Sequence, residues 1–332
     1  MKKVIVTGSE LGALEEERGI LAGVAELVAM PADSEDELDG GLLAEADAFM
    51  IYHTMRITEK TLRKLTKCRF IVRCGVGYDN VDYALARTLG MDVANVPDYG
   101  TEEVADSAIG LMLSLTRGIN LLNVRLRDTA TPWTYTHPAP LRRLRGRQYS
   151  VVGLGRIGTA AAQRAKALGM DVAFYDPYKA DGYDKSLGIR RVESLAELLA
   201  SSYVVSMHCP LTAETRGMIN ATTLAQFARG SYLVNTSRGA VVDTSAIPAA
   251  LASGQLAGAA IDVLEHEPPD ANDPLLRAWR DPSHPAYERL ILNSHCAFYS
   301  VEGLADMHRK GTEACRRVLL GERARNIVNA AL

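Results

Sequence analysis

Short runs of β-branched and aromatic residues alternate with amphipathic patterns along most of the chain. In the first hundred residues we predict strands at residues 4–7, 27–30, 49–52, 70–72 and 93–96. Helical spacing of apolar residues predicts helices at residues 35–45, 59–67 and 81–89, with Thr58 and Asn80 as N-caps of the last two. Strands and helices that alternate in this way predict a parallel sheet covered by helices.

The longest helical pattern spans residues 101–128 and carries a broad apolar stripe without an internal proline. We interpret it as one helix that ends a first α/β unit and begins a second. In the second unit we predict strands at residues 149–152, 172–175, 203–207, 232–235, 259–262 and 290–293. The length of 332 residues also predicts two domains, because one domain usually holds roughly 100 to 200 residues.

Composition and charge narrow the class of protein. Apolar residues make up 47% and charged residues 23% of the chain, which is ordinary globular usage and excludes disordered and collagen-like classes. The 37 Lys and Arg residues against 40 Asp and Glu residues give a net charge of -3, so no overall positive field attracts nucleic acid or an anionic membrane. Arginines cluster within residues 141–147, where a nucleic-acid patch is the alternative to a solvated loop. We therefore expect a small-molecule partner.

The five cysteines are scattered and form no Cys-x-x-Cys pair. This spacing argues against a disulfide framework and against a zinc site, so we predict no metal. The chain shows no apolar run of roughly 18 residues and no signal-peptide pattern. We expect reduced thiols and a cytoplasmic protein without a membrane segment.

A glycine motif carries the clearest mechanism. The predicted strand at residues 149–152 runs into Gly153, Gly155 and Gly158, and helical spacing follows from residue 157. Gly153 permits the tight turn, Gly155 lets the backbone approach a pyrophosphate, and Gly158 lets the helix pack on the strand. The helix N-terminus offers unpaired N–H groups to the anion. Strand, glycine turn and helix in this order predict dinucleotide binding.

Asp176 ends the next predicted strand, where a carboxylate accepts hydrogen bonds from the adenosine ribose. A carboxylate about 4 Å from a 2′-phosphate costs on the order of 4 kcal/mol per unit charge at an effective dielectric near 20. Asp176 therefore favours NAD over NADP. Lys179 argues against this preference, because its ammonium is near enough in sequence to offset the charge of a phosphate.

Ionisable residues also follow the later predicted strands, and ligands of open α/β sheets bind beyond the carboxyl ends of strands. An oxo acid that accepts a hydride needs an Arg to fix its carboxylate and a His to protonate its carbonyl oxygen. A nearby Glu holds the His ring and favours its imidazolium form. The candidate segments are His208-Cys209-Pro210, Thr236-Ser237-Arg238, Glu265-His266-Glu267 and Ser294-His295.

The first unit has its own candidate anion site at Arg73-Cys74-Gly75-Val76-Gly77. Glycines after a strand can present successive backbone N–H groups to a carboxylate, although a plain tight turn also fits. Arg56 and Arg73 offer a second cation that would select a substrate with two anionic groups. A salt bridge to a neighbouring carboxylate is the alternative for them.

At these residues the sequence resembles the D-isomer-specific 2-hydroxyacid dehydrogenases over nearly its whole length, and within them most the C-terminal-binding-protein-like branch. The matching segments are residues 73–82, 95–97, 153–158, 234–239, 262–268 and His295, and, for the branch, residues 52–54, 175–178 and 295–300.

The resemblance implies the site residues. The catalytic set is Arg238 for the substrate, His295 as acid/base and Glu267 paired with His295. The substrate-binding set is Tyr52, His53, Arg73, Gly75, Val76, Gly77 and Phe298. The set lining the NAD site is Val104, Gly153, Gly155, Arg156, Ile157, Gly158, Asp176, His208, Cys209, Pro210, Thr215, Asn235, Thr236, Ser237, Arg238, Asp262 and His295.

The resemblance also implies an architecture and an activity. The expected fold is two doubly wound α/β domains, a flavodoxin-like substrate domain of residues 1–100 plus 299–332 and a Rossmann NAD domain of residues 101–298, with the active site in a cleft between them. The expected protein is a homodimer that reduces a 2-oxo acid to a D-2-hydroxy acid with NADH. Ser294 and Phe298 depart from the pattern, because the family commonly has Pro before the catalytic His and the branch has Trp at 298. The alternative function is an NAD(H)-sensing, corepressor-like interaction protein with little turnover.

Overall fold

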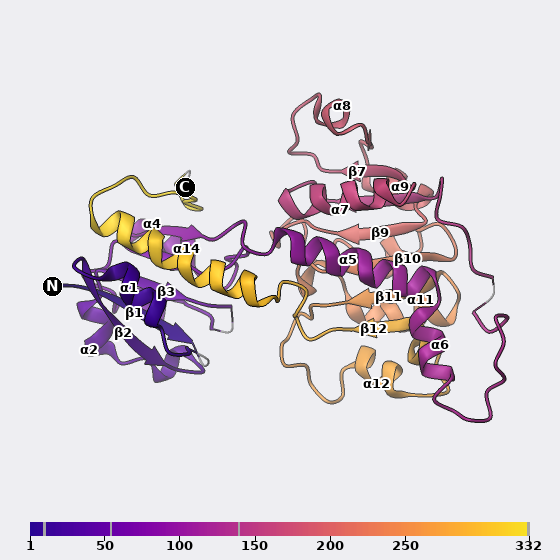
Figure 1. Cartoon of the computed structure of the whole chain (residues 1–332), viewed down its shortest axis with the longest axis horizontal. Coiled ribbons are helices and arrows are strands. Elements are labelled where there is room, and N and C mark those ends of the chain that lie inside the picture. Colours follow the sequence, from indigo (N-terminus) through magenta and orange to yellow (C-terminus); the bar gives the residue numbers. More distant parts are fainter. Residues whose placement is uncertain (9–10, 54, 139, 331–332) are drawn as a thin grey trace. The chain divides into compact units, whose positions relative to one another are not determined.

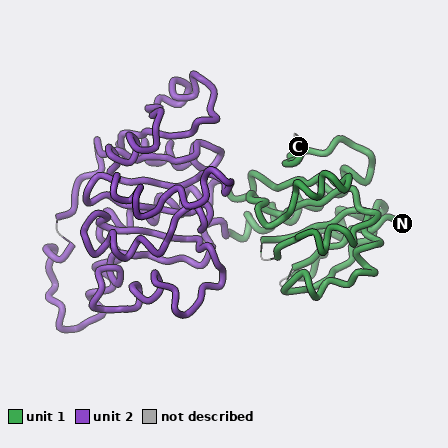
Figure 2. Tube along the Cα trace, turned by 180° about the vertical axis from the view of Figure 1, so that it is seen from behind, with its two compact units in different colours: residues 1–100, 300–332 green, residues 101–299 purple. Residues whose placement is uncertain are grey.

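The computed structural model describes residues 1–8, 11–53, 55–138 and 140–330. The chain divides into two compact units, residues 1–100 with 300–332 and residues 101–299 (Figure 2). We call them unit 1 and unit 2 and describe each by itself. Thr54, part of one segment that carries the resemblance, lies outside the described residues.

Unit 1 is built on a five-stranded sheet in the order β2-β1-β3-β4-β5, in which every pair is parallel. This is the flavodoxin-like order. Ile5, Phe49, Ile71 and Val93 lie opposite one another across four strands and form the centre of its core. The strands are β1 (Lys2–Gly8), β2 (Ala25–Pro31), β3 (Ala48–Ile51), β4 (Phe70–Arg73) and β5 (Asp92–Asn95).

The helices of unit 1 depart from the sequence prediction in three places. The helix expected at residues 35–45 is a 3-10 turn, η1 (Glu35–Glu37), followed by α2 (Gly40–Glu45), because the Asp39 carboxylate accepts hydrogen bonds from the N–H groups of Gly41 and Leu42. α3 (Glu59–Leu62) starts at its predicted cap Thr58 but ends early. Asn80 is not a cap, since Asp82 caps α4 (Tyr83–Thr88).

Two helices of unit 1 were not predicted from periodicity, α1 (Glu15–Leu21) and α14 (Val301–Leu319). They contact each other, and α14 also contacts β3 and β4 (Figure 1). Gly311 of α14 permits this packing, because a Cβ there would lie 2.5 Å from the Cys74 sulfur.

Unit 2 contains a seven-stranded sheet in the order β12-β11-β10-β9-β6-β7-β8, again entirely parallel. Its order contains the Rossmann arrangement, and the predicted α/β fold class is confirmed. Only the two-residue strand β8 was not predicted. The strands are β6 (Gln148–Val152), β7 (Asp171–Tyr175), β8 (Arg190–Arg191), β9 (Val204–Met207), β10 (Ser231–Asn235), β11 (Leu256–Ile261) and β12 (Leu290–Leu292).

The prediction of one continuous helix over residues 101–128 is wrong, because the structure has two helices there. α5 (Thr101–Thr116) ends before Gly118, which adopts a left-handed conformation with φ 66°, and α6 (Ile119–Arg125) begins there. A Cβ on Gly118 would lie 2.7 Å from the Cβ of Pro138, so the helix breaks where two chain segments lie close together. Hydrophobic periodicity continues through such a break because it reports only which face is buried.

Helices cover both faces of the sheet of unit 2. α5 and α7 (Arg156–Ala167) lie against each other on one face, over Val151 and Val204, and the next residue along each strand faces the other side (Figure 1). The remaining helices are α8 (Tyr183–Leu187), α9 (Leu195–Ser201), α10 (Ala221–Leu224), α11 (Ile247–Ala252), α12 (Pro274–Arg280) and α13 (Ala286–Arg289), with 3-10 turns η2 (Gly239–Val241) and η3 (Thr244–Ala246). Within the described residues no helix is both long and apolar enough to cross a bilayer.

Candidate active site

In the glycine turn between β6 and α7, two glycines are closely surrounded by other atoms and one has free space beside it. Gly153 has φ 91°, and a Cβ there would lie 2.6 Å from the backbone nitrogen of Cys209. A Cβ on Gly158 would lie 2.2 Å from the carbonyl oxygen of Gly153, whereas a Cβ on Gly155 would meet nothing within 4 Å. Gly155 is the N-cap of α7, and no side chain caps the first N–H groups of the helix. This is a cradle for an anion.

Asp176 lies directly after β7 and is tied to the glycine turn. Its Oδ2 accepts a hydrogen bond from the N–H of Leu154 at 2.9 Å, and its Oδ1 accepts one from the N–H of Tyr178 at 3.0 Å. The ammonium of Lys179 lies 5.1 Å from the centre of the Tyr183 ring, and the described side chains include no ion pair between Lys179 and Asp176. Lys179 therefore does not pair with the Asp176 carboxylate in this structure.

The segment after β9 is polar and largely enclosed. His208 Nε2 lies 2.8 Å from the hydroxyl of Ser206, and Nδ1 has no partner among the described residues. Burial lowers the pKa of His208 to about 4 and raises the pKa of the Cys209 thiol to about 11, so both side chains are neutral near pH 7. Thr215 donates its hydroxyl proton to the carbonyl of Pro210 at 2.6 Å and fixes the following turn.

Arg238 follows β10 in extended backbone. Asn235 shapes this segment, because its amide donates to the carbonyl of Arg238 at 3.0 Å and its Oδ1 accepts from the N–H and hydroxyl of Ser237. The Thr236 hydroxyl is buried without a partner in the described part of the chain. An open glycine cradle, a carboxylate after β7 and an orphaned hydroxyl at this edge fit a dinucleotide such as NAD.

The side chains of His295 and Glu267 are in direct contact in unit 2. His295 Nδ1 lies 2.6 Å from Oε2 of Glu267, while Oε1 of Glu267 accepts from the N–H of Leu264 at 2.7 Å. The carboxylate is therefore fixed at both oxygens. Since Nδ1 is bonded to Glu267, Nε2 is the ring nitrogen that can reach a substrate. The ring edge of His295 also meets Phe298, with centroids 6.0 Å apart.

Asp262 holds the turn that aims the imidazole. His295 has a positive φ of 55°, which is uncommon outside glycine. Its N–H donates to the carbonyl of Asp262 at 2.7 Å, and the buried Asp262 carboxylate accepts from the N–H groups of Cys296 and Ala297 at 3.0 and 3.1 Å. Burial is the main cause that raises the pKa of Asp262, which these hydrogen bonds oppose. Asp262 is thus a support for His295.

In the loop after β4 in unit 1, two backbone carbonyl groups accept hydrogen bonds from the following strand segment. Val96 N–H donates to Gly75 at 3.1 Å, and the Asn95 amide donates to Val76 at 2.6 Å. In the described part of the chain, the N–H groups of Gly75, Val76 and Gly77 donate to no backbone carbonyl. Arg73 is only 5% exposed, and its NH1 occupies the space that a Cβ of Gly75 would need. A guanidinium therefore lies behind a row of unpaired N–H groups.

The segment after β3 is anchored by residues that the sequence did not single out for this purpose. The Asn80 amide donates to the carbonyls of Tyr52 and Met55, and Asn80 Oδ1 accepts from Arg73 at 3.3 Å. The Tyr52 hydroxyl lies 3.1 Å from His308 Nδ1, which is also 2.6 Å from the buried carboxylate of Glu17. His53 is exposed. Periodicity gives no signal for such side-chain to main-chain bonds.

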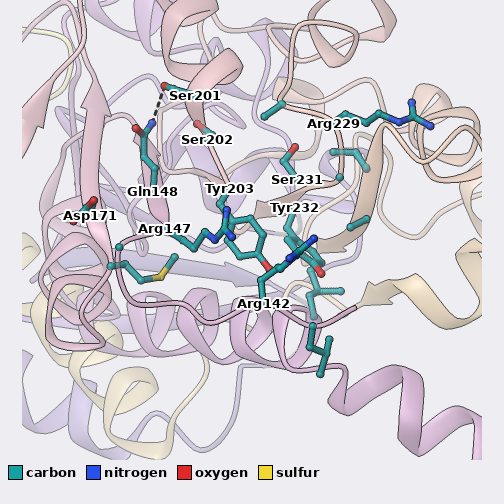
Figure 3. Close-up of a pocket in the computed structure, with 18 of the residues that line it drawn as sticks. Arg142, Arg147, Gln148, Asp171, Ser201, Ser202, Tyr203, Arg229, Ser231 and Tyr232 are labelled. Atoms are coloured by element: carbon teal, nitrogen blue, oxygen red, sulfur yellow. Dashed lines mark hydrogen bonds between the residues drawn. The ribbon is translucent and has the colours of Figure 1, made fainter. Parts of the chain in front are cut away.

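A cavity of about 1510 Å³ in unit 2 lies at the other edge of the sheet (Figure 3). Gln148, Asp171 and Ser231, which line it, are the first residues of their strands, so the cavity is remote from the carboxyl ends. Some of its cations already bond to the chain, for example Lys166 to the carbonyls of Leu187 and Gly188, both at 3.0 Å. We therefore place the site at the carboxyl ends of the strands.

Comparisons with known proteins show which family the chain resembles. A sequence profile described as "D-isomer specific 2-hydroxyacid dehydrogenase, NAD binding domain" matches residues 109–297. The chain is 32% identical over 311 residues to C-terminal-binding protein 1 of Caenorhabditis elegans, covering 92% of this chain and 42% of that protein. It is 36% identical over 241 residues to D-3-phosphoglycerate dehydrogenase of Bacillus subtilis (strain 168), covering 73% of this chain and 44% of that protein. It thus spans less than half the length of either relative.

The structure is also similar to solved structures over its full length. One is a D-lactate dehydrogenase from Aquifex aeolicus complexed with NAD and lactic acid, with a TM-score of 0.87 and 26% sequence identity over 99% of this chain and 100% of that chain. Both sheets of the present chain therefore have a counterpart in a solved protein that binds NAD.

Proposed function

This chain belongs to the D-isomer-specific 2-hydroxyacid dehydrogenase family and binds NAD, and from that premise we propose that it reduces a 2-oxo acid to a D-2-hydroxy acid. The observation that carries the proposal is the 2.6 Å contact between His295 Nδ1 and Glu267 Oε2, which assigns Nδ1 to Glu267 and orients the imidazole ring. A carboxylate on Nδ1 orients the ring and stabilises its imidazolium form.

His295 and Arg238 divide the work on the substrate. Bound NADH would supply the hydride for the carbonyl carbon. His295 Nε2 gives its proton to the carbonyl oxygen, so that the products would be a hydroxy acid, NAD and a neutral imidazole. Arg238 binds the carboxylate with the planar geometry of its guanidinium and polarises the carbonyl group. Glu267 orients the His295 ring for this proton transfer.

The loop of Gly75, Val76 and Gly77 binds the substrate carboxylate through its unpaired N–H groups. Arg73 supports that loop from behind, where its charge adds to the field at the N–H groups. The buried position of Arg73 makes direct contact with a second anionic group less favourable than the sequence suggested. The roles of Tyr52 and Phe298 in substrate binding stay predictions, and we leave the identity of the substrate to experiment.

An NAD(H)-sensing interaction protein is the second candidate, and the similarity to C-terminal-binding protein 1 favours it. We prefer the reductase because Arg238, Glu267 and His295 are all present and the pair Glu267 and His295 is in contact. The homodimer and the cytoplasmic location stay predictions.

The replacement His295→Gln tests the proposed acid. We expect turnover to fall by about a thousandfold, within the usual range for a general acid, while NADH affinity changes less than about twofold. His266→Gln is the matched control, because His266 is an exposed histidine next to Glu267 in the loop after β11. An equal loss of turnover and of NADH affinity would show that His295 is structural instead.

A further inference from the structure

A side-chain hydrogen bond joins the loop after β7 to the loop after β9. The Tyr178 hydroxyl donates to the carboxylate of Glu214. In the strand order β9-β6-β7, strand β6 lies between these two loops and leads into the glycine turn. The bond therefore crosses the edge of the sheet where the Rossmann arrangement places the adenosine half of a dinucleotide.

Two carboxylates flank Tyr178. Its backbone N–H donates to Asp176 at 3.0 Å, and its hydroxyl holds Glu214. The bond to Glu214 is the main cause that raises the pKa of the Tyr178 hydroxyl, with further contributions from the charges of Glu214 and Asp176. Both carboxylates are therefore hydrogen-bonded to the same residue.

The cations nearest in sequence are engaged elsewhere. Lys179 lies over the ring of Tyr183. Arg191 donates to the carbonyl of Lys179 at 2.9 Å and pairs with the carboxylates of Asp181 and Glu193 at 3.6 and 3.0 Å. In the described structure neither cation pairs with Asp176 or Glu214, and Arg216, two residues after Glu214, pairs with the carboxylate of Glu265 at 2.7 Å.

We propose that Glu214, held in place by Tyr178, is a second coenzyme-selecting residue that disfavours NADP(H). NADP differs from NAD by a 2′-phosphate on the adenosine ribose, which the resemblance places at Asp176, and the inference rests on that placement. A carboxylate that Tyr178 prevents from turning away repels the phosphate and leaves NAD unaffected. Asp176 acts on the ribose directly, and Glu214 acts on the added charge.

Fluorescence titration of the full chain with NADH and with NADPH, without oxo acid, tests the proposal. For Glu214→Gln we expect NADPH to bind about fivefold more tightly, as for one solvent-screened charge several ångströms away, and NADH to bind within about twofold of its original affinity. For Tyr178→Phe we expect a smaller gain of about twofold for NADPH, since Glu214 then rotates freely. Asp181→Asn is the matched control, because it removes the same charge from the loop that carries Tyr178, at a fully exposed position, and should change neither affinity.

Two results would overturn the role of Glu214. One is an unchanged NADPH affinity in Glu214→Gln, and the other is an equal loss of NADH and NADPH affinity, which would make Glu214 a structural residue of the loop. Asp176→Ser separates this failure from a wrong cofactor placement. If Asp176→Ser improves NADPH binding and Glu214→Gln does not, only the proposal on Glu214 fails, whereas no response to either variant refutes the placement of the ribose.

Discussion

Replacement of single glycines in the turn after β6 separates cofactor binding from packing. Gly155→Ala places a methyl group in a region with no atom within 4 Å, at an ordinary φ of -78°, so the fold accommodates it. We expect the free energy of unfolding to stay the same or to rise by about 0.4–1 kcal/mol, because alanine restricts the unfolded chain. The methyl group would instead obstruct the anion that the N–H groups of α7 bind.

The loss of NADH affinity in Gly155→Ala follows from the hydrogen bonds that it prevents. One bond to a charged group contributes about 1.5–3 kcal/mol, so NADH affinity should fall by roughly 10- to 100-fold. Gly158→Ala should behave differently, because its Cβ would lie 2.2 Å from the carbonyl oxygen of Gly153. Overpacking of this kind costs about 1–3 kcal/mol, which for a unit of this size lowers Tm by roughly 2–12 °C.

Thermal melts of the free protein and fluorescence titrations with NADH provide the two readouts. We expect Gly155→Ala to keep its Tm and lose NADH affinity, and Gly158→Ala to lose Tm. If Gly155→Ala bound NADH as tightly as the unmodified chain, the cradle at the start of α7 would not be the pyrophosphate site. If Gly155→Ala melted at as low a temperature as Gly158→Ala, the conclusion that a methyl group fits beside Gly155 would be wrong.

Three further predictions follow from individual contacts. Glu267→Gln should lower turnover about 10- to 100-fold with NADH affinity unchanged, because an amide stabilises imidazolium less than a carboxylate does. Steady-state kinetics and an NADH titration test this prediction, and an equal fall of turnover and NADH affinity would contradict it. The pKa of His208 is about 4 when folded and near 6.5 when unfolded, so only the unfolded chain gains the proton as pH falls from 6.5 to 4. Urea unfolding should show a loss of about 2 kcal/mol between pH 7 and pH 4.5 that is absent in His208→Gln, and equal losses in both proteins would rule out His208 as the cause. His308→Ala should lower the free energy of unfolding by about 1–3 kcal/mol, because it leaves the buried carboxylate of Glu17 without its partner, and an unchanged urea midpoint would contradict that role.

The strands were predictable because alternation and β-branched runs are local properties of the sequence. The glycine turn was predictable for the same reason, since Gly153, Gly155 and Gly158 lie within six residues and each has a separate steric task. The break at Gly118 was not predictable, because it depends on contact with Pro138, which lies 20 residues away in the sequence.

The site was predictable in its residue types and less so in its supports. Arg238, Glu267 and His295 stand after strands, where ligands of α/β sheets bind, and the family resemblance gave them roles. Asp262 as the holder of the His295 turn and Asn80 as the anchor of the segment after β3 required coordinates, because their bonds link side chains to distant main-chain groups.

NADH oxidation by the purified chain, followed by absorbance across a panel of 2-oxo acids, tests the proposed reaction most directly. The panel contains glyoxylate, hydroxypyruvate, phenylpyruvate, oxaloacetate, a thioether oxo acid and phosphonopyruvate. We predict rapid NADH oxidation with at least one of them, and its loss in His295→Gln at unchanged NADH affinity. Tight NADH binding without turnover on any member of the panel would contradict the reductase and favour the NAD(H)-sensing protein.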